Sequence, residues 1–255
     1  MATREGRPYH HGDLREALLD AAERVLDREG LGGLSLRAIS RRAGVTHAAA
    51  YHHFLDRGAL VRALAARGFD RLTAALEGAA GRASGPGAFL EVGIAYVAFA
   101  AGAPGVFRLM FGAEAAGGRG TDAALMASGD RALSVLKEGA RALTPGGSEA
   151  EVLGTALRSW SLVHGLAALL LDDQLAHLGL ALRDHARIAR AVLSGGPVEP
   201  GPALVPPRGE EDGAEAPLAA GAERDRRPLR GRRSTPRSGR SLPPGRPPGM
   251  PRRSR

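Results

Sequence analysis

The composition of this 255-residue chain changes at Ser194. All ten aromatic residues precede that position, whereas 13 of the 17 prolines follow it. A segment that lacks aromatic residues and is rich in proline cannot bury enough apolar surface to offset the entropy lost on ordering. The sequence therefore predicts a folded part that ends at Ser194 and a disordered tail, rich in Pro, Arg and Gly, over residues 195–255.

The formal net charge of +8 comes from this tail. Residues 224–255 contain 12 arginines and one acid, a net charge of +11, which leaves −3 for residues 1–223. The high pI is therefore no evidence that the folded part binds nucleic acid. Two interpretations of the tail stay open. It is a cationic arm that adds sequence-independent DNA affinity through counterion release, or, as the composition favours, a solvated extension whose 34 Arg against one Lys reflect a GC-rich gene.

Several classes of protein are excluded by composition. The absence of cysteine excludes a disulfide scaffold, a zinc finger and a thiol nucleophile. Residues 1–12 lack the apolar core of a signal peptide. The longest uncharged stretch, residues 92–107, is shorter than the roughly 20 residues that a membrane-spanning helix needs. We expect a cytoplasmic protein with no membrane segment, no cofactor and no metal site.

Apolar residues before Ser194 recur at helical spacing, and no segment alternates apolar and polar residues as a strand does. The sequence predicts an all-α fold with a small N-terminal bundle, a larger helical domain and the tail. Gly112–Thr121 is predicted to be a glycine-rich loop. The predicted helices are residues 13–29 (capped by Asp13), 36–43, 47–54, 57–76, 88–101, 105–111, 122–143, 148–177 and 180–193.

Residues 35–54 have the pattern of a helix-turn-helix, in which two short helices meet at a tight turn around Gly44. Ile39 and Val45 are placed to hold the two helices together, which leaves the outer face of the second helix exposed. A face of small, polar residues can lie deep in a DNA major groove. The N–H groups that follow Ser35 suit phosphate oxygens. The residues on the exposed face are Thr46, His47, Ala49 and His52.

Residues 12–72 resemble the DNA-binding domain of the tetracycline-repressor (TetR-type) family of bacterial transcription regulators. The resemblance is carried by Glu29-Gly30, Leu34-Ser35-Leu36-Arg37, Ala43-Gly44-Val45, Tyr51-His52-His53-Phe54 and Ala59-Leu60. Residues 88–194 resemble the family's regulatory domain in length and helix order. Residues 160–165, Trp-Ser-Leu-Val-His-Gly, are similar to a motif of one subgroup of such domains.

The resemblance implies particular DNA contacts. Residues placed like Ser35, Tyr51 and Arg57 hold the DNA backbone in this family. Base edges are read by residues placed like Arg37, Thr46, His47, Ala49 and His52. The family usually has a Lys followed by an acid where this chain has Arg57-Gly58. Gly58 costs about 1 kcal/mol of helix propensity in that first turn.

Seven large side chains between residues 88 and 194 are candidates for lining a ligand cavity, although each of them could equally belong to an ordinary core. They are Phe89, Tyr96, Phe99, Phe107, Met110, Phe111 and Trp160. Residues 159–171 are apolar around the whole helix except at His164, so this helix must be buried on both sides. We expect it to pair with the final helix and to form a four-helix dimer interface that includes Leu171 and Ile188.

The sequence thus predicts a homodimeric, sequence-specific transcription regulator, with its DNA-binding domain at residues 12–72 and its regulatory and dimerisation domain at residues 88–194. We expect a repressor that a small apolar ligand releases from its double-stranded DNA operator. Catalysis is not expected, because no nucleophile elbow surrounds Ser161 near His164, and the single lysine, Lys137, belongs to no phosphate-binding loop. The alternative is a small-molecule binding or sequestering protein whose helix-turn-helix no longer reads DNA.

Overall fold

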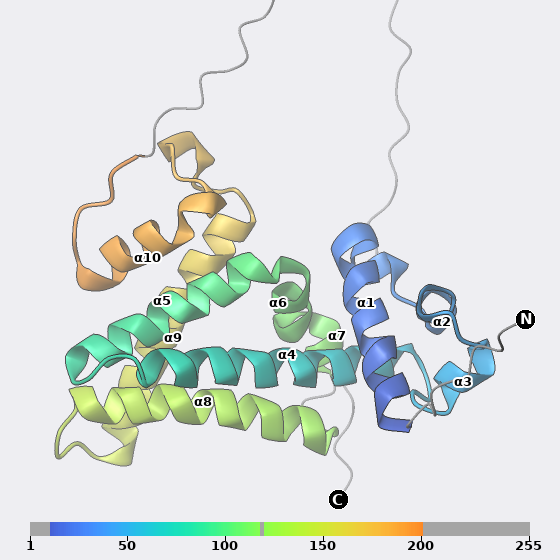
Figure 1. Ribbon diagram of the computed structural model, residues 1–255. Coiled ribbons are helices and arrows are strands. Elements are labelled where there is room, and N and C mark those ends of the chain that lie inside the picture. The colour runs from blue at the N-terminus through green and yellow to red at the C-terminus, as the bar shows by residue number, and fades with distance from the viewer. Residues whose placement is uncertain (1–10, 118–119, 201–255) are drawn as a thin grey trace, which may run out of the picture. The chain divides into compact units, whose positions relative to one another are not determined.

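A computed structural model describes residues 11–117 and 120–200, with side chains from Leu14 onward except Pro86. These residues form ten α-helices and two short 3₁₀ helices and contain no strand (Figure 1), which confirms the all-α prediction. The predicted tail lies outside the described residues from 201 onward. The elements are α1 (His11–Gly33), α2 (Leu36–Ala43), α3 (His47–Tyr51), α4 (Arg57–Ala80), α5 (Pro86–Gly102), α6 (Pro104–Phe111), α7 (Ala113–Ala116), α8 (Ala123–Leu143), α9 (Glu149–Leu171), η1 (Ala176–Leu178), η2 (Leu182–Asp184) and α10 (His185–Ser194).

The first helix departs from its predicted bounds at both ends. Asp13 lies within α1, which already includes His11, so it is not the N-cap. Gly30 interrupts the helix with a φ of 67°, a value that favours glycine, and one further turn follows before Leu34. The fully buried Leu18 and Val25 lie on the inner face of this helix.

Side-chain caps define the helix-turn-helix. Ser35 has an extended backbone and accepts a hydrogen bond from the N–H of Ala38 at 3.1 Å, so α2 begins at the next residue. Gly44 ends α2 with a φ of 71°. Thr46 then caps α3 through the N–H of Ala49 at 3.2 Å. The third helix ends at Tyr51, three residues earlier than predicted.

The long helix α4 is common to the N-terminal helices and the larger helical domain. Asp56 caps it, accepting from the N–H of Ala59 at 2.6 Å. The first half of α4 buries Leu60 and Leu64, and the helix contacts α1, α5, α6, α7 and α8. In Figure 1 it runs alongside α8 over most of its length. A movement of α4 would therefore be felt in both parts of the described chain.

The C-terminal helices differ from the prediction where local signals are weak. The ninth helix ends at Leu171 rather than near residue 177, because Asp173 adopts a φ of 55° that an α-helix cannot contain. Two 3₁₀ turns follow, and α10 begins at His185 rather than at Leu180. Within the predicted loop at residues 112–121, the structure has the short helix α7.

The described chain remains packed for six residues beyond Ser194. Gly195 has a φ of 70°, and the N–H of Gly196 donates to the carbonyl of Ala191 at 2.9 Å, which ends α10. Arg187 donates to the carbonyl of Glu199 at 2.7 Å, and Val198 packs against the core. Contacts with the folded part therefore continue past the predicted boundary at Ser194, at least to Val198 and Glu199.

No single helix in the described ranges is both long and apolar enough to cross a membrane. Helices α5 and α6 meet that criterion only together, across a bend of 106°.

Candidate DNA-binding surface and ligand cavity

The outer face of α3 is the exposed side of the helix-turn-helix. His47, Ala48, Tyr51 and His52 are all exposed, while Ala50 is fully buried and α3 packs against α2. Ala49, predicted to read bases, is only partly exposed and lies at the edge of this face. Ala48 takes the more outward position and was missed, although its spacing of four residues from His52 places both on one side of a helix.

The two capping hydroxyls retain a donor for DNA. Ser35 and Thr46 each use an oxygen lone pair to accept a backbone N–H. The hydroxyl hydrogen of each is not needed for that bond and can be donated to a phosphate oxygen. Both caps lie at the start of a helix, where backbone N–H groups favour anions.

Tyr51 and His47 form an edge-to-face pair one turn apart on α3. Their ring centroids are 4.8 Å apart, with the planes at 80°. Tyr51 remains 50% exposed, so its hydroxyl is accessible beyond the helix surface. The contact restricts both rings and so orients two of the predicted DNA-contacting groups.

Arg37 is exposed on α2, and Arg41, one turn later, is exposed on the same helix. The sequence prediction included Arg37 and missed Arg41, although their spacing of four residues indicates a common face. Arg42, by contrast, is directed to Glu29 of α1 at 3.4 Å. Arg37 and Arg41 therefore place two exposed positive charges on α2, the helix that packs against α3.

Arg57 is bonded within the protein. Its Nε donates to the carbonyl of Leu34 and its Nη2 to the carbonyl of Leu31, both at 2.8 Å. Its Nη1 pairs with the carboxylate of Glu114 in α7. All three guanidinium nitrogens therefore have intramolecular partners, which favours a role in joining α1, α4 and α7 over the phosphate contact that the family resemblance implied.

A cavity of about 500 Å³ lies among α4, α5, α8, α9 and α10. Four of the seven predicted residues line it: Phe89, Tyr96, Phe111 and Trp160. Phe69, Leu72 and Leu76 contribute from α4, and Leu193 from α10. A volume of this size lies in the usual range for small-molecule sites.

The other three predicted residues do not line this cavity. Met110 is fully buried against α4, where a Cβ on Gly68 would lie 2.6 Å from its Sδ. Phe107 is buried between Tyr96 and His164, at ring-centroid distances of 5.7 and 5.3 Å. Phe99 is partly buried against the core. These side chains fill space between helices and leave none for a ligand.

Helix α8 supplies more of the lining residues that the prediction missed than any other helix. Met126, Asp130, Leu133 and Leu136 all line the cavity. Their spacing of three or four residues indicates one face of a helix. That signal was present in the sequence, but an apolar face alone does not tell whether it meets a void or a neighbouring helix.

Three polar side chains form a network in the aromatic wall of the cavity. Trp160 Nε1 donates to the Tyr96 hydroxyl at 3.1 Å, and that hydroxyl lies 2.9 Å from His164 Nδ1. Because tryptophan can only donate, the tyrosine proton is best placed on the bond to Nδ1, which puts the histidine proton on Nε2. Burial lowers the pKa of His164 and raises that of Tyr96, although the hydrogen bond from Trp160 opposes the latter shift. The network is therefore neutral near pH 7.

The exposed half of α9 carries leucines in two pairs, Leu153 with Leu157 and Leu162 with Leu169, which helical spacing places on its two edges. Leu153, Leu157, Leu162 and Leu169 are between 41% and 48% exposed. A Cβ at Gly165 would meet no atom within 4 Å, so the middle of this face is open. We call these four leucines and Gly165 the α9 face. The two residues predicted for a dimer interface are placed differently: Ile188 is fully buried within its own chain, and Leu171 is partly buried against the core.

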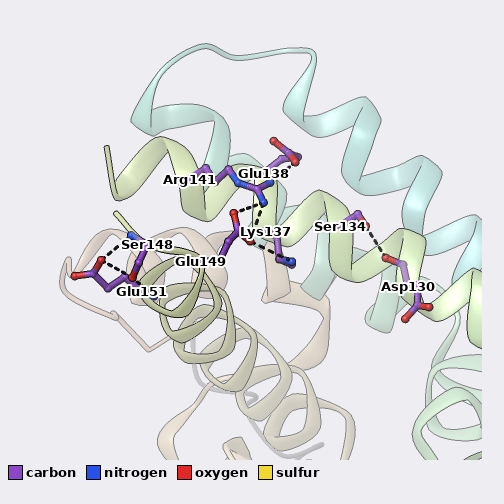
Figure 2. A network of polar contacts seen from close by, with 8 residues as sticks. All are labelled: Asp130, Ser134, Lys137, Glu138, Arg141, Ser148, Glu149 and Glu151. Carbon is purple, nitrogen blue, oxygen red and sulfur yellow. Dashed lines mark hydrogen bonds and ion pairs between the residues drawn. The ribbon is translucent and has the colours of Figure 1, made fainter. Parts of the chain in front are cut away.

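Ion pairs hold the start of α9 against α8 (Figure 2). Arg141 Nη2 contacts both carboxylate oxygens of Glu149, at 2.9 and 3.1 Å, and Nη1 contacts Glu138 at 2.5 Å. Ser148 and Glu151 form a reciprocal capping box at the first turn of α9. Exposed pairs contribute little energy singly, but together these contacts fix where α9 begins.

Among the residues that the structure describes, no group of three or more His, Asp or Glu side chains is arranged to hold a metal ion.

Two family models match the chain. The model described as "Bacterial regulatory proteins, tetR family" matches residues 18–64, and "Tetracyclin repressor-like, C-terminal domain" matches residues 89–195. The curated HTH-type transcriptional regulator YobS of Bacillus subtilis, itself described as uncharacterized, is 32% identical over 96 residues. That match covers 38% of this chain, which spans only 50% of the length of YobS.

Solved structures are similar over most of the described chain. A protein of unknown function from Rhodococcus sp. RHA1 is 33% identical, with a TM-score of 0.60, and the match covers 74% of this chain and 98% of that one. A putative TetR-family regulator from Mesorhizobium loti is 18% identical, with a TM-score of 0.52 over 73% of this chain and 96% of its own, and shows likeness of fold alone. With both halves matched and the helix-turn-helix formed, the chain belongs to the TetR family of bacterial transcription regulators.

Proposed function

We propose that the protein is a homodimeric repressor that binds a DNA operator through α2 and α3 and leaves it when a small, largely apolar ligand enters the cavity. The observation that carries the proposal is that α4 serves both sites. Its Leu60 and Leu64 belong to the core beside the helix-turn-helix, and its Phe69, Leu72 and Leu76 line the cavity. A ligand that moves α4 would therefore move the DNA-binding helices.

The exposed face of α3 supports a major-groove contact. Imidazole groups at His47 and His52 can hydrogen-bond base edges, and the methyl group of Ala48 can approach a thymine methyl. Tyr51, Ser35 and the arginines of α2 are placed at the border of this face, where phosphates would lie. Phosphate contacts set orientation and affinity, whereas base contacts set sequence preference.

The α9 face supports dimerisation. Four exposed leucines on one helix are costly in water, and pairing with a second copy would bury them at roughly 25 cal/mol per Å². Gly165 and Ala168 would allow two such helices to approach closely. A dimer would also place two copies of α3 about 34–36 Å apart, the spacing of successive major grooves, which a single copy cannot reach.

The ligand must discriminate between two positions of α4, since equal affinity for both would shift nothing. A coupling free energy of about 1–3 kcal/mol would weaken operator binding roughly 5–150-fold. Two tethers would transmit the movement: the ion pair of Arg57 with Glu114, and that of Arg62 with Asp122, the N-cap of α8, at 3.1 Å.

A gel-shift titration against the DNA that flanks its own gene tests the proposal. We expect a retarded complex that specific competitor removes and random DNA does not. The double substitution Arg37→Ala, Arg41→Ala should weaken binding to specific and random DNA alike and lower its dependence on salt. The matched control is Arg82→Ala, which removes an exposed arginine beyond the end of α4. A chain that binds no flanking DNA, yet is stabilised against heat by a small molecule, would instead be a binding protein with a silent helix-turn-helix.

A further inference from the structure

The lining of the cavity is long on one side. Its lining residues on α8 extend from Leu125 to Leu143, and 18 residues of helix rise about 27 Å. A wall of that length, lined mainly by apolar side chains, suits an extended alkyl chain with a small head group.

Two of the four polar side chains in the lining are already bonded to protein. The Tyr96 hydroxyl and Trp160 Nε1 bond to one another, and the hydroxyl also bonds to His164. Apart from Ser159, the remaining polar side chain in the lining is Asp130, which is also the only charged one. The cavity therefore presents a negative charge and no positive charge to a ligand.

Asp130 lies at an exposed part of the lining. It is an exposed residue on α8, one turn after Met126, which is 45% exposed and also lines the cavity. The neighbouring cation, Arg131, is directed to Asp70 at 2.5 Å and to Ser128 at 2.9 Å. In Figure 2, Asp130 lies apart from the ion pairs around Arg141 and is joined to Ser134 only through its backbone carbonyl. Its carboxylate is thus available to a ligand at the mouth of the cavity.

We propose that the ligand is a cationic amphiphile, with an extended hydrocarbon chain in the cavity and an ammonium group beside Asp130. Burial of each methylene tightens binding about fourfold, so the hydrocarbon chain provides most of the affinity. The carboxylate selects the sign of the head group. A fatty carboxylate of equal length would bring like charges together with no lining cation to offset them. This inference rests on the proposed function only in taking the cavity as a ligand site.

The test is calorimetric titration of the full chain, without DNA, with three probes that share a decyl chain: decyltrimethylammonium, decanol and decanoate. We expect decyltrimethylammonium to bind most tightly and decanoate least tightly. Added salt should weaken the binding of decyltrimethylammonium alone. Asp130→Asn should weaken decyltrimethylammonium by about two- to fivefold, the range of an exposed ion pair, and leave decanol unchanged. Glu77→Gln, an exposed α4 acid outside the lining, is the matched control and should change neither.

Leu133→Trp should abolish binding of all three probes by filling the cavity. If Leu133→Trp does not fold, Leu133→Phe takes its place and should weaken the binding of all three probes. Tighter binding of decanoate, or an equal loss for decanol and the ammonium in Asp130→Asn, would overturn the inference. Operator release is a separate measurement. Release by decanoate and not by the ammonium would overturn the ligand class while the proposed switch stands, whereas the expected binding order without any release would contradict the switch and support the ligand class.

Discussion

The ion pair between Arg57 and Glu114 joins the first residue of α4 to α7, three residues after Phe111 in the cavity wall. The same guanidinium holds the carbonyls of Leu31 and Leu34 at the end of α1. One side chain therefore connects the end of α1, the start of α4 and α7. Its removal should lower the free energy of unfolding.

Arg57→Ala should lower the free energy of unfolding by about 1.5–3 kcal/mol, because two partly buried carbonyls lose a charged donor. Urea unfolding at 25 °C measures the change. Arg37→Ala is the control: that side chain is exposed, so unfolding should stay within about 0.5 kcal/mol of the parent, while DNA affinity falls. An unchanged midpoint for Arg57→Ala would mean that water replaces the guanidinium at no cost.

His47→Ala should change which operator is preferred, at a cost of about 1–3 kcal/mol confined to one base position. The histidine lies on the outer face of α3, where its ring can reach a base edge. Binding to a set of operators with single-base changes, followed by fluorescence anisotropy, gives the position. His177→Ala, in η1, is the control, because it removes an exposed histidine far from α3 in the sequence. It should leave the affinity for every operator unchanged. An equal loss of affinity for all operators would mean that His47 contacts the DNA backbone and not a base.

Leu169→Glu should convert the dimer into monomers and remove most of the specific DNA affinity. The substitution places a charge on the α9 face without touching the cavity lining. Sedimentation velocity reports the mass. Leu55→Glu is the control, because Leu55 is 82% exposed in the turn before α4 and away from α9. If Leu169→Glu sediments as a dimer, the two copies associate through another surface.

The unfolding free energy should decrease as the pH falls below about 6.5, the ordinary pKa of histidine. Burial lowers the pKa of His164 in the folded state, so the unfolded chain takes up the proton first. The loss begins at the unfolded pKa and is complete below the folded one. Comparison of His164→Asn with the parent between pH 4.5 and 8 isolates this contribution, and the variant should show the shallower slope. Equal slopes would place the histidine in a solvated environment.

Substitution by alanine at two glycines on α8 should change the stability of the protein in opposite directions. A Cβ at Gly139 would lie 2.2 Å from Cδ2 of Phe89, so Gly139→Ala should destabilise by about 1–3 kcal/mol. A Cβ at Gly129 meets nothing within 4 Å, so Gly129→Ala should stabilise by up to about 1 kcal/mol through helix propensity. Thermal unfolding of both variants, compared with that of the parent, measures the two changes in stability. Destabilisation by both would indicate that the open space at Gly129 closes in solution.

Four of the helix starts could be predicted from sequence because their causes are local. Ser35, Thr46, Asp56 and Asp122 each cap the helix that follows them, through an N–H three residues away. The end of α9 could not be predicted in this way. Leucines continue at helical spacing as far as Leu182, and only the left-handed Asp173 shows that the helix has stopped.

The cavity wall was only partly predictable, for a different reason. Periodicity shows which residues face inward but not whether they meet a void. Met110 fills its space because Gly68, 42 positions earlier, allows close approach. Ile188 was assigned to the dimer because the helix at residues 159–171, apolar all round, was expected to pair with the final helix, yet Ile188 is fully buried and α10 packs against α5 of the same chain. Both outcomes depend on contacts between residues distant in sequence.

In and just after α3, the side chains that stabilise the fold differ from those that face outward. Ala50 and the following Phe54 are buried, whereas His47, Ala48, Tyr51 and His52 make almost no contribution to the core. Substitutions at the four outer positions therefore carry little penalty in stability. In a lineage of duplicated genes, the target sequence of such a regulator can diverge while its scaffold is preserved, and related copies can acquire separate targets without passing through a poorly folded ancestor.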